Sequence, residues 1–262
     1  MKINKESVNH YCKWIADGRP FSFAGFSDAE WYCILGHRAG DKTGLGQVID
    51  YQHGLRLAVV LTERDRDKQF LQAMPKCLWP SLEGPGVPGL NEGEIDYWRG
   101  IYHLTAPVYE RDKVLDDLAR DAGLYPWIRE FERHPVCLIG PKELKDTKHF
   151  LHWREHVVIT SPNLHLEKDG IDRAVESALT FNKGREGSLF LVSAGVSAAV
   201  IIDRIHDNVM ASKGWCLDMG SVWDAFVGIG GQREWRKNLY ADKVRYELWL
   251  RDNLHGKEGR GW

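Results

Sequence analysis

Two acidic residues near the start of the chain, Asp28 and Glu30, have a spacing that suits phosphate or metal chemistry. They follow an apolar run, Phe21–Ala24, that is typical of a short buried strand and stops at Gly25. In α/β proteins such a strand end, turn and helix start is where ligands bind. The same residues are also ordinary at helix starts, with Asp28 as N-cap and Glu30 favoured by the helix dipole. Both interpretations are open at this point.

A second junction with small residues, Ser193-Ala-Gly-Val-Ser197, follows the apolar run 188–193. Small residues such as Gly195 let a ligand approach the backbone, and the free N–H groups of a helix start suit a phosphate. The segment is not a G-x-G-x-x-G motif, a P-loop or a nucleophile elbow. A tight packing turn without a ligand is the alternative interpretation.

A third junction, Asp218-Met-Gly-Ser-Val-Trp-Asp224, follows the apolar run 215–218. Asp218, Asp224 and the hydroxyl of Ser221 come just after the carboxyl end of a strand, together with Gly220. Parallel sheets bind ligands at this edge. The alternative is a capping network for the segment that follows.

Two groups of basic residues invite functional interpretations. His149 and His152 could share a helix face with His156 close behind, but a zinc site needs ligands of fixed geometry, and the lysines and arginines of this segment favour a solvated surface. Arg233 and Arg236, beside a tryptophan, could bind a phosphate or stack on a base. An ordinary surface helix is the alternative for each arginine.

The segments that must position these residues alternate between apolar runs and helical patterns. This alternation predicts an α/β fold, a Rossmann-like, mostly parallel sheet with helices on both faces. The expected strands are 21–24, 136–140, 156–160, 188–193 and 215–218. The expected helices are 4–17, one through residue 35, 50–63 with Leu55, Val59 and Val60 facing inward, 107–121, 125–133, 142–154, 168–182, 195–211 and 233–254.

We expect one large domain over 1–262, with an inserted loop and helical region at about 75–134. Residues 36–46 hold four glycines and are expected to form a loop. Residues 75–93 are rich in proline and glycine, which predicts an ordered lid or a linker. The C-terminal region 233–262 is expected to be a helix followed by a loose tail from 255.

Composition narrows the class of protein. With 35 basic against 37 acidic residues in 262, the formal net charge is −2, which provides no global attraction to nucleic acid or an anionic membrane. Five scattered cysteines argue against a disulfide framework and for a reducing compartment. The N-terminal residues lack a signal-peptide pattern, and the longest apolar stretch, 189–202, is too short to span a membrane. We therefore expect a soluble cytoplasmic protein.

Taken together, the segments resemble the GT-D-type bacterial glycosyltransferases, whose motif reads roughly Arg-Phe-Gly-Asp-Gly-Glu where this chain has 25–30. The similarity covers about 20–75 and 135–235. It rests on the order of short segments: Phe26-Ser-Asp-Ala-Glu30, Gly46-Gln47 before a helix, the Leu-Ile-Gly-Pro strand end at 138–141, Ser161-Pro-Asn163, the serine-rich junction at 193–198, and Leu217-Asp-Met-Gly-Ser221.

The resemblance implies a metal-dependent glycosyltransferase that moves a sugar from a nucleotide-sugar, a UDP-hexose, to an acceptor hydroxyl. The acceptor would be a glycan, a glycoprotein or a modified base of phage DNA, and a homo-oligomer is left open. By the same resemblance Asp28 and Glu30 would hold Mn²⁺ or Mg²⁺, hard ions that favour oxygen ligands. The expected donor-binding residues are Phe26, Ser27, Ser193, Gly195, Ser197, Gly220, Ser221 and Arg233.

The chain departs from the family motif at its first positions. Gly25 stands where the family has an arginine, and Ser27 and Ala29 stand where it has glycines. The arginine would be a cation beside the diphosphate. Another basic residue, such as Arg38 or Arg233, would have to replace it.

A further departure concerns the catalytic base. Ser221 stands where the family often has a histidine, so Asp218 and Asp224 are the candidates for that role. The altered motif also keeps two other functions open. One is a non-catalytic α/β module that binds a nucleotide or glycan, and the other is an enzyme that acts on a different phosphate ester.

Overall fold

The structure is a computed structural model, and it describes residues 2–3, 9–36, 47–74, 108–111, 114–160, 163–228 and 234–256. The predicted loop at 36–46 lies outside these residues except for Gly36, and so does the predicted lid or linker at 75–93. Of the predicted tail from 255, only residues 255–256 are described. Arg38, Arg233 and the side chain of Asp28 also lie outside the described residues.

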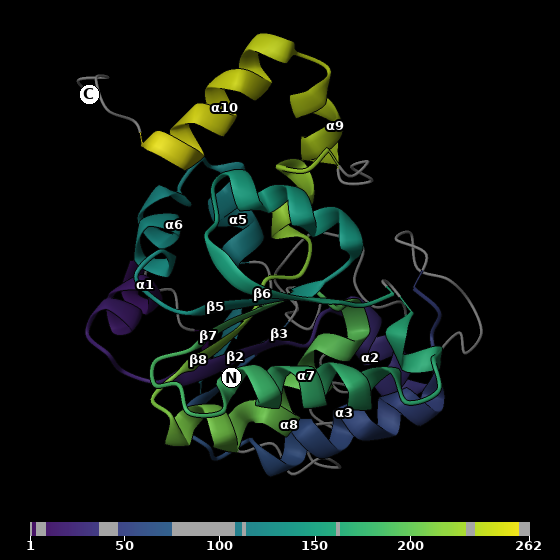
Figure 1. The fold of residues 1–262 in the computed structure, drawn as a ribbon. Coiled ribbons are helices and arrows are strands. Elements are labelled where there is room, and N and C mark those ends of the chain that lie inside the picture. The colour runs from purple at the N-terminus through teal and green to yellow at the C-terminus, as the bar shows by residue number, and fades with distance from the viewer. Residues whose placement is uncertain are drawn as a thin grey trace.

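The described strands form one sheet in which every pairing is parallel (Figure 1). Its order is β1-β4-β3-β2-β8-β7-β5-β6. The strands are β1 (Lys2–Ile3), β2 (Phe21–Gly25), β3 (Phe70–Met74), β4 (Val108–Arg111), β5 (Val136–Gly140), β6 (Trp153–Val158), β7 (Leu189–Val192) and β8 (Trp215–Asp218). The predicted α/β fold with a Rossmann-like parallel sheet is confirmed.

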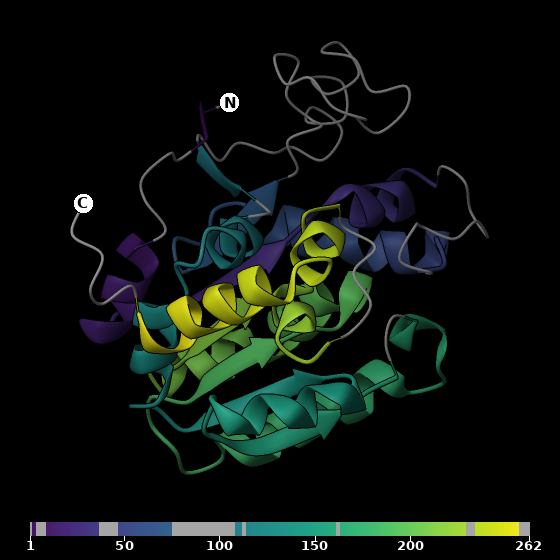
Figure 2. The same ribbon diagram turned by 90° about the horizontal axis from the view of Figure 1, so that it is seen from above.

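Helices cover both faces of the sheet, as Figure 1 shows. One face is covered by α2 (Asp28–Leu35), α3 (Tyr51–Glu63), α7 (Gly170–Asn182) and α8 (Ala198–Ala211). The other is covered by α1 (Asn9–Ala16), α5 (Val114–Arg120), α6 (Tyr125–Phe131) and the 3-10 helices η2 (Lys142–His149) and η5 (Val222–Ala225). The two C-terminal helices, α9 (Glu234–Tyr240) and α10 (Lys243–His255), lie beyond this second layer (Figure 2).

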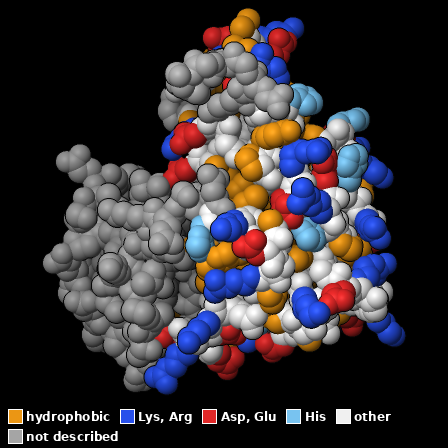
Figure 3. Space-filling view, turned by 90° about the vertical axis from the view of Figure 1, so that its left-hand side faces the viewer, with side chains coloured by type: hydrophobic (Ala, Val, Ile, Leu, Met, Phe, Trp, Pro, Cys, Tyr) orange, Lys and Arg blue, Asp and Glu red, His pale blue; other side chains and the backbone are white. Residues whose placement is uncertain are grey.

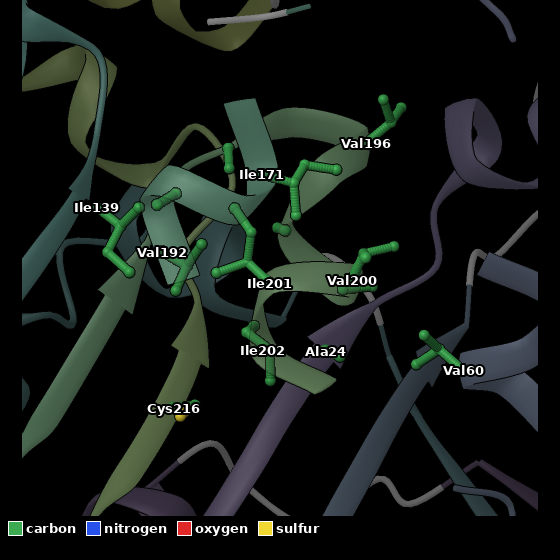
Figure 4. Close-up of a cluster of buried hydrophobic side chains, with 14 of the residues drawn as sticks. Ala24, Val60, Ile139, Ile171, Val192, Val196, Val200, Ile201, Ile202 and Cys216 are labelled. Atoms are coloured by element: carbon green, nitrogen blue, oxygen red, sulfur yellow. The ribbon is translucent and has the colours of Figure 1, made fainter. Parts of the chain in front are cut away.

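Each face of the sheet has its own apolar core, because successive side chains of a strand point to opposite faces. In β2, Phe21 and Phe23 belong to the core under α1 and α6, whereas Ala24 belongs to the core under α8. Figure 4 shows the core under α8, which includes the buried side chains of Val192 and Ile201. These cores fix the strands that carry the candidate site at their carboxyl ends.

After the carboxyl ends of neighbouring strands, the chain continues on opposite faces of the sheet. After β2 and β7 the chain enters α2 and α8 on one face, and after β5 and β8 it enters η2 and η5 on the other. Since β2 pairs with β8 and β8 with β7, the connections diverge between each pair. Such switch points are where open parallel sheets bind ligands.

Several predicted elements are wrong in detail. The expected helix 107–121 is the strand β4 followed by α5, and β1 and β3 were not predicted. Segment 142–154 is the 3-10 helix η2 followed by β6, which begins three residues earlier than the expected strand. In η2 the buried residues are Leu144 and Thr147, and this spacing of three matches the three residues per turn of a 3-10 helix.

The expected helix 233–254 is divided into α9 and α10. The two helices are separate because Asp242 caps the start of α10. Its side chain accepts the backbone N–H of Arg245 at 3.0 Å. The predicted inward face of α3 is also partly wrong. Val60 is buried, but Leu55 and Val59 are 43% and 49% exposed, because the helix instead turns His53, Leu57 and Leu61 inward.

The surface of the described residues agrees with the balanced composition. On the face drawn in Figure 3, Lys and Arg side chains are interspersed with Asp and Glu. No helix among the described residues is long and apolar enough to cross a membrane.

Candidate functional site

The carboxyl ends of β2 and β8 are joined by the carboxylate of Asp218. Its Oδ2 accepts the backbone N–H of Gly25 at 3.1 Å, and its Oδ1 accepts the backbone N–H of Gly220 at 2.9 Å. A side chain at Gly25 would crowd this contact, because a Cβ there would lie 2.9 Å from Oδ2 of Asp218. The structure thus brings together two of the three junctions that the sequence singled out.

The start of α2 is built by Ser27 and Glu30 rather than by Asp28. Ser27 is the N-cap, and together with Glu30 it forms a capping box. The backbone N–H of Ser27 donates to Oε2 of Glu30 at 2.9 Å, and the hydroxyl of Ser27 donates to the same oxygen. Asp28 is the first residue of the helix, so the prediction that it is the N-cap is wrong. Glu30 therefore makes a capping contact at the start of α2.

Phe26, expected among the donor-binding residues, is fully buried in the core under α2. Its backbone N–H donates to the carbonyl of Ala73 at 2.7 Å. Its side chain therefore contributes to the packing of the sheet. Burial of this ring explains why an aromatic residue lies between the strand end and the N-cap.

The remaining junction, 193–197, lies at the carboxyl end of β7, where a 3-10 turn, η4 (Gly195–Ser197), leads into α8. Gly195 has a φ of 55°, a conformation that glycine adopts without strain. Ser193 is 6% exposed and Ser197 is fully buried. Neither hydroxyl has a hydrogen-bond partner among the described residues, although buried hydroxyls nearly always have one.

Two histidines that were not singled out in the sequence lie beside this turn. Nε2 of His53 donates to the carbonyl of Val196 at 2.8 Å, and Nε2 of His165 donates to the carbonyl of Val48 at 3.0 Å. The two rings lie 4.8 Å apart between centroids. Burial lowers the pKa of His53 to about 4, so the ring is neutral and acts as a donor that holds the turn.

The candidate residues after β8 have partners of their own. Nη1 of Arg236 donates to Oδ2 of Asp224 at 3.1 Å, and Nη2 donates to the hydroxyl of Ser221 at 2.9 Å. Arg236 is 1% exposed, so its prediction as a surface residue is wrong. These contacts assign Asp224 to an ion pair that holds the fold, which leaves Asp218 as the carboxylate at the sheet edge.

Within the described ranges, no group of three or more His, Cys, Asp or Glu side chains is placed to hold a metal ion. His149 and His152 are exposed, while His156 donates to the carbonyl of Gly140 at 3.3 Å. Carboxylate oxygens accept more than one bond, so Glu30 and Asp218 can still bind a hard cation that a ligand brings with it.

A Ser-His-Asp series lies at the amino ends of the strands, opposite the carboxyl ends that carry the candidate site. Nδ1 of His206 is 2.8 Å from the hydroxyl of Ser22, and its Nε2 is 3.0 Å from Oδ2 of Asp67. Ser22 lies near the start of β2, at the amino ends of the strands and away from the three junctions, and its buried hydroxyl is already bonded to His206. The series therefore connects β2, α8 and the turn before β3, and it is not a nucleophile site.

The chain matches no family model, no curated protein and no solved structure.

Proposed function

We propose that this protein is a glycosyltransferase that binds a nucleotide-sugar at the carboxyl edge of β2, β8 and β7 and transfers the sugar to an acceptor hydroxyl. The observation that carries the proposal is the pair of buried serine hydroxyls in the junction between β7 and α8. Ser193 and Ser197 lack partners among the described residues and lie in the junction that leads into α8, in which the N–H groups of Ser197 and Ala198 already donate to the carbonyls of Ala194 and Gly195. A diphosphate would supply the missing acceptors and the negative charge that a helix start favours.

The carboxylates at this edge support a divalent cation as part of the ligand. Glu30 and Asp218 carry negative charge at the strand ends, and the guanidinium of Arg236 is bound by Asp224 and Asp116. A diphosphate entering beside two carboxylates is repelled unless a cation neutralises it. Mn²⁺ or Mg²⁺, held by Asp28 and Glu30 together with the diphosphate, would stabilise the charge that develops on the departing nucleotide.

In the transfer itself, the acceptor oxygen bonds to the anomeric carbon of the sugar while the bond from that carbon to the diphosphate breaks. The acceptor hydroxyl loses its proton, and Asp218 is the carboxylate that we assign to receive it. Ser193 and Ser197 would orient the leaving diphosphate. The acceptor is a hydroxyl of a glycan, a glycoprotein or a modified DNA base.

The test is calorimetric titration of UDP and UDP-glucose with and without Mn²⁺, using Ser193→Ala and Ser197→Ala. A hydrogen bond to a charged group contributes ~1.5–3 kcal/mol, so each variant should bind UDP at least about tenfold more weakly. Ser188→Ala is the matched control, because Ser188 is also buried without a partner among the described residues but lies at the amino end of β7. Its affinity should equal that of the parent protein.

Release of UDP from UDP-glucose, with any acceptor or with water, then separates an enzyme from a binding module. Binding without turnover would favour the non-catalytic α/β module. If UDP and its sugars do not bind at all, the proposal is wrong, and a screen of other phosphate esters becomes the next experiment.

A further inference from the structure

Arg236 is a buried arginine that joins three segments far apart in the sequence. Besides its bonds to Asp224 and to the hydroxyl of Ser221, its Nη2 donates to Oδ1 of Asp116 at 3.0 Å and to the carbonyl of Ser221. Asp116 lies on α5, Ser221 and Asp224 lie in the turn after β8, and Arg236 lies on α9. One guanidinium thus binds the backbone and two side chains of the turn.

The turn that Arg236 holds begins at the candidate site. Ser221 is three residues from Asp218, whose carboxylate meets Gly25 at the end of β2. Inside the turn, the N–H of Val222 donates to the carbonyl of Met219 at 3.0 Å, which connects Asp218 to Ser221 by a short, hydrogen-bonded path. A displacement at Ser221 therefore moves the residues that carry Asp218.

The C-terminal helices reinforce the same turn. The hydroxyl of Tyr240 donates to the carbonyl of Asp224 at 3.3 Å, and the hydroxyl of Tyr246 donates to the carbonyl of Ala225 at 3.1 Å. On the other side, Nε1 of Trp249 donates to the carbonyl of Ala119 on α5 at 2.7 Å. All three bonds go to backbone carbonyls, and two of them lie in the chain after β8, so α9 and α10 fix its path.

The chemistry of the contact requires an arginine. The planar fork of a guanidinium can reach Asp116, Asp224 and Ser221 together, whereas the single ammonium of a lysine is a point charge that cannot match this geometry. Burying a cation with two carboxylates costs desolvation free energy that their attraction often does not recover. In addition, Nε of Arg236 has no partner among the described residues. The arrangement is better explained by placement of the turn than by its contribution to stability.

We propose that Arg236 is a positioning residue of the nucleotide-sugar site, which acts by holding the turn 219–224 so that Asp218 meets Gly25. The consequence for donor binding rests on the proposed function, whereas the placement of the turn does not. The two parts are tested by different measurements on the same full-length variants.

The first measurement is amide hydrogen exchange of the ligand-free protein, comparing Arg236→Lys and Ser221→Ala with the parent. Amides of 218–225 should exchange at least about tenfold faster in Arg236→Lys and to a smaller extent in Ser221→Ala, while α7 and α8 keep their protection. Ser221→Ala removes one hydroxyl and leaves the ion pairs of Arg236 in place, so it reports on the turn even if Arg236→Lys unfolds. The control Arg129→Lys changes an exposed arginine that pairs with Glu132.

The second measurement is UDP affinity and, for active protein, the split between KM and kcat. Arg236→Lys should raise the UDP dissociation constant at least about fivefold, and millimolar methylguanidinium should restore part of the affinity of Arg236→Ala but not that of Ser193→Ala. If exchange at 218–225 equals that of the parent in both variants, Arg236 does not position the turn. If exchange rises but UDP binds as in the parent, the position of the turn does not affect donor binding. A parent protein that ignores UDP overturns the proposed function and leaves the exchange result to decide the placement.

Discussion

The carboxylate of Asp218 bridges the ends of two adjacent strands by accepting the backbone N–H of Gly25 at 3.1 Å while it also accepts that of Gly220. Gly25 and Asp218 are 193 positions apart in the chain. Parallel pairing of β2 with β8 places their carboxyl ends side by side, and the sheet order thereby assembles the candidate site. A carboxylate fits this position because each of its oxygens faces one N–H donor.

Asp218→Asn should cost both stability and ligand binding. An amide has one acceptor oxygen, so its NH₂ group would face either the N–H of Gly25 or that of Gly220. The contact with Gly25 is partly buried, whereas that with Gly220 is exposed to water, so the amide oxygen should keep Gly25. We therefore expect the free energy of unfolding to fall by ~0.5–1.5 kcal/mol, the net contribution of one hydrogen bond. Urea denaturation measures it, with Asp146→Asn on the exposed side of η2 as the control. Equal losses in both variants would contradict the bridging role.

Gly25→Ala should disturb the site more than the fold. The added Cβ would lie 2.9 Å from Oδ2 of Asp218, which is closer than atoms pack, so the carboxylate must move. We expect a stability loss of ~1–3 kcal/mol, as for other overpacked positions, and loss of detectable UDP binding. A double-mutant cycle with Asp218→Ala checks the cause, because removal of the carboxylate should make Gly25→Ala nearly neutral for stability. Additive losses would show that Asp218 is not the colliding group.

Much of the fold could be predicted because β5, β7 and β8 are nearly continuous apolar runs, a pattern that is typical of strands buried on both faces. β3 could not, since Phe-Leu-Gln-Ala-Met carries a polar residue in its middle. Gln72 is buried there because its Nε2 donates to the carbonyl of Leu61 at 2.8 Å. That partner exists only once α3 packs against the sheet.

The sequence predicted which segments meet at the candidate site, but not which distant residues their side chains contact. The three junctions were found because small and acidic residues follow apolar runs, and the sheet brings those after β2 and β8 together. The burial of Arg236 was not foreseen, because its partner Asp116 is 120 positions away and outside any local pattern. The role of His53 was missed for the same reason, since the carbonyl that fixes it belongs to Val196, 143 positions later.

Substitutions of Glu30 can separate its capping contact from metal binding. Glu30→Ala removes the acceptor of the Ser27 N–H, and we expect the free energy of unfolding to fall by about 1 kcal/mol, as for other lost helix caps. Glu30→Gln keeps an acceptor oxygen and should stay within about 0.5 kcal/mol of the parent, but its neutral amide lacks the negative charge with which a carboxylate attracts a divalent cation. Glu30→Gln should therefore lose the Mn²⁺-dependent part of the UDP-induced rise in Tm. Retention of that part would leave Glu30 with the capping role alone.

Acidification should destabilise the protein through its buried histidines. Burial lowers the pKa of His53 to about 4, and it also lowers the pKa values of His165 and His206. The unfolded chain, with histidine pKa values near 6.5, then binds more protons than the folded one as pH falls below about 6.5. Stability is thus highest above that value and is lost toward pH 4, with His53 alone contributing a loss of about 2 kcal/mol between pH 7 and pH 5.

His53→Gln tests this assignment, because the amide nitrogen can still donate to the carbonyl of Val196 but does not titrate. Urea denaturation at pH 7 and pH 5 should show that the variant loses about 2 kcal/mol less than the parent over this interval, with similar stability at pH 7. His206→Gln provides a comparison at the other edge of the sheet, where the ring contacts Ser22 and Asp67. If the parent and His53→Gln lose the same free energy on acidification, His53 is not held neutral by burial, and the turn at Val196 would then be held by a charged ring.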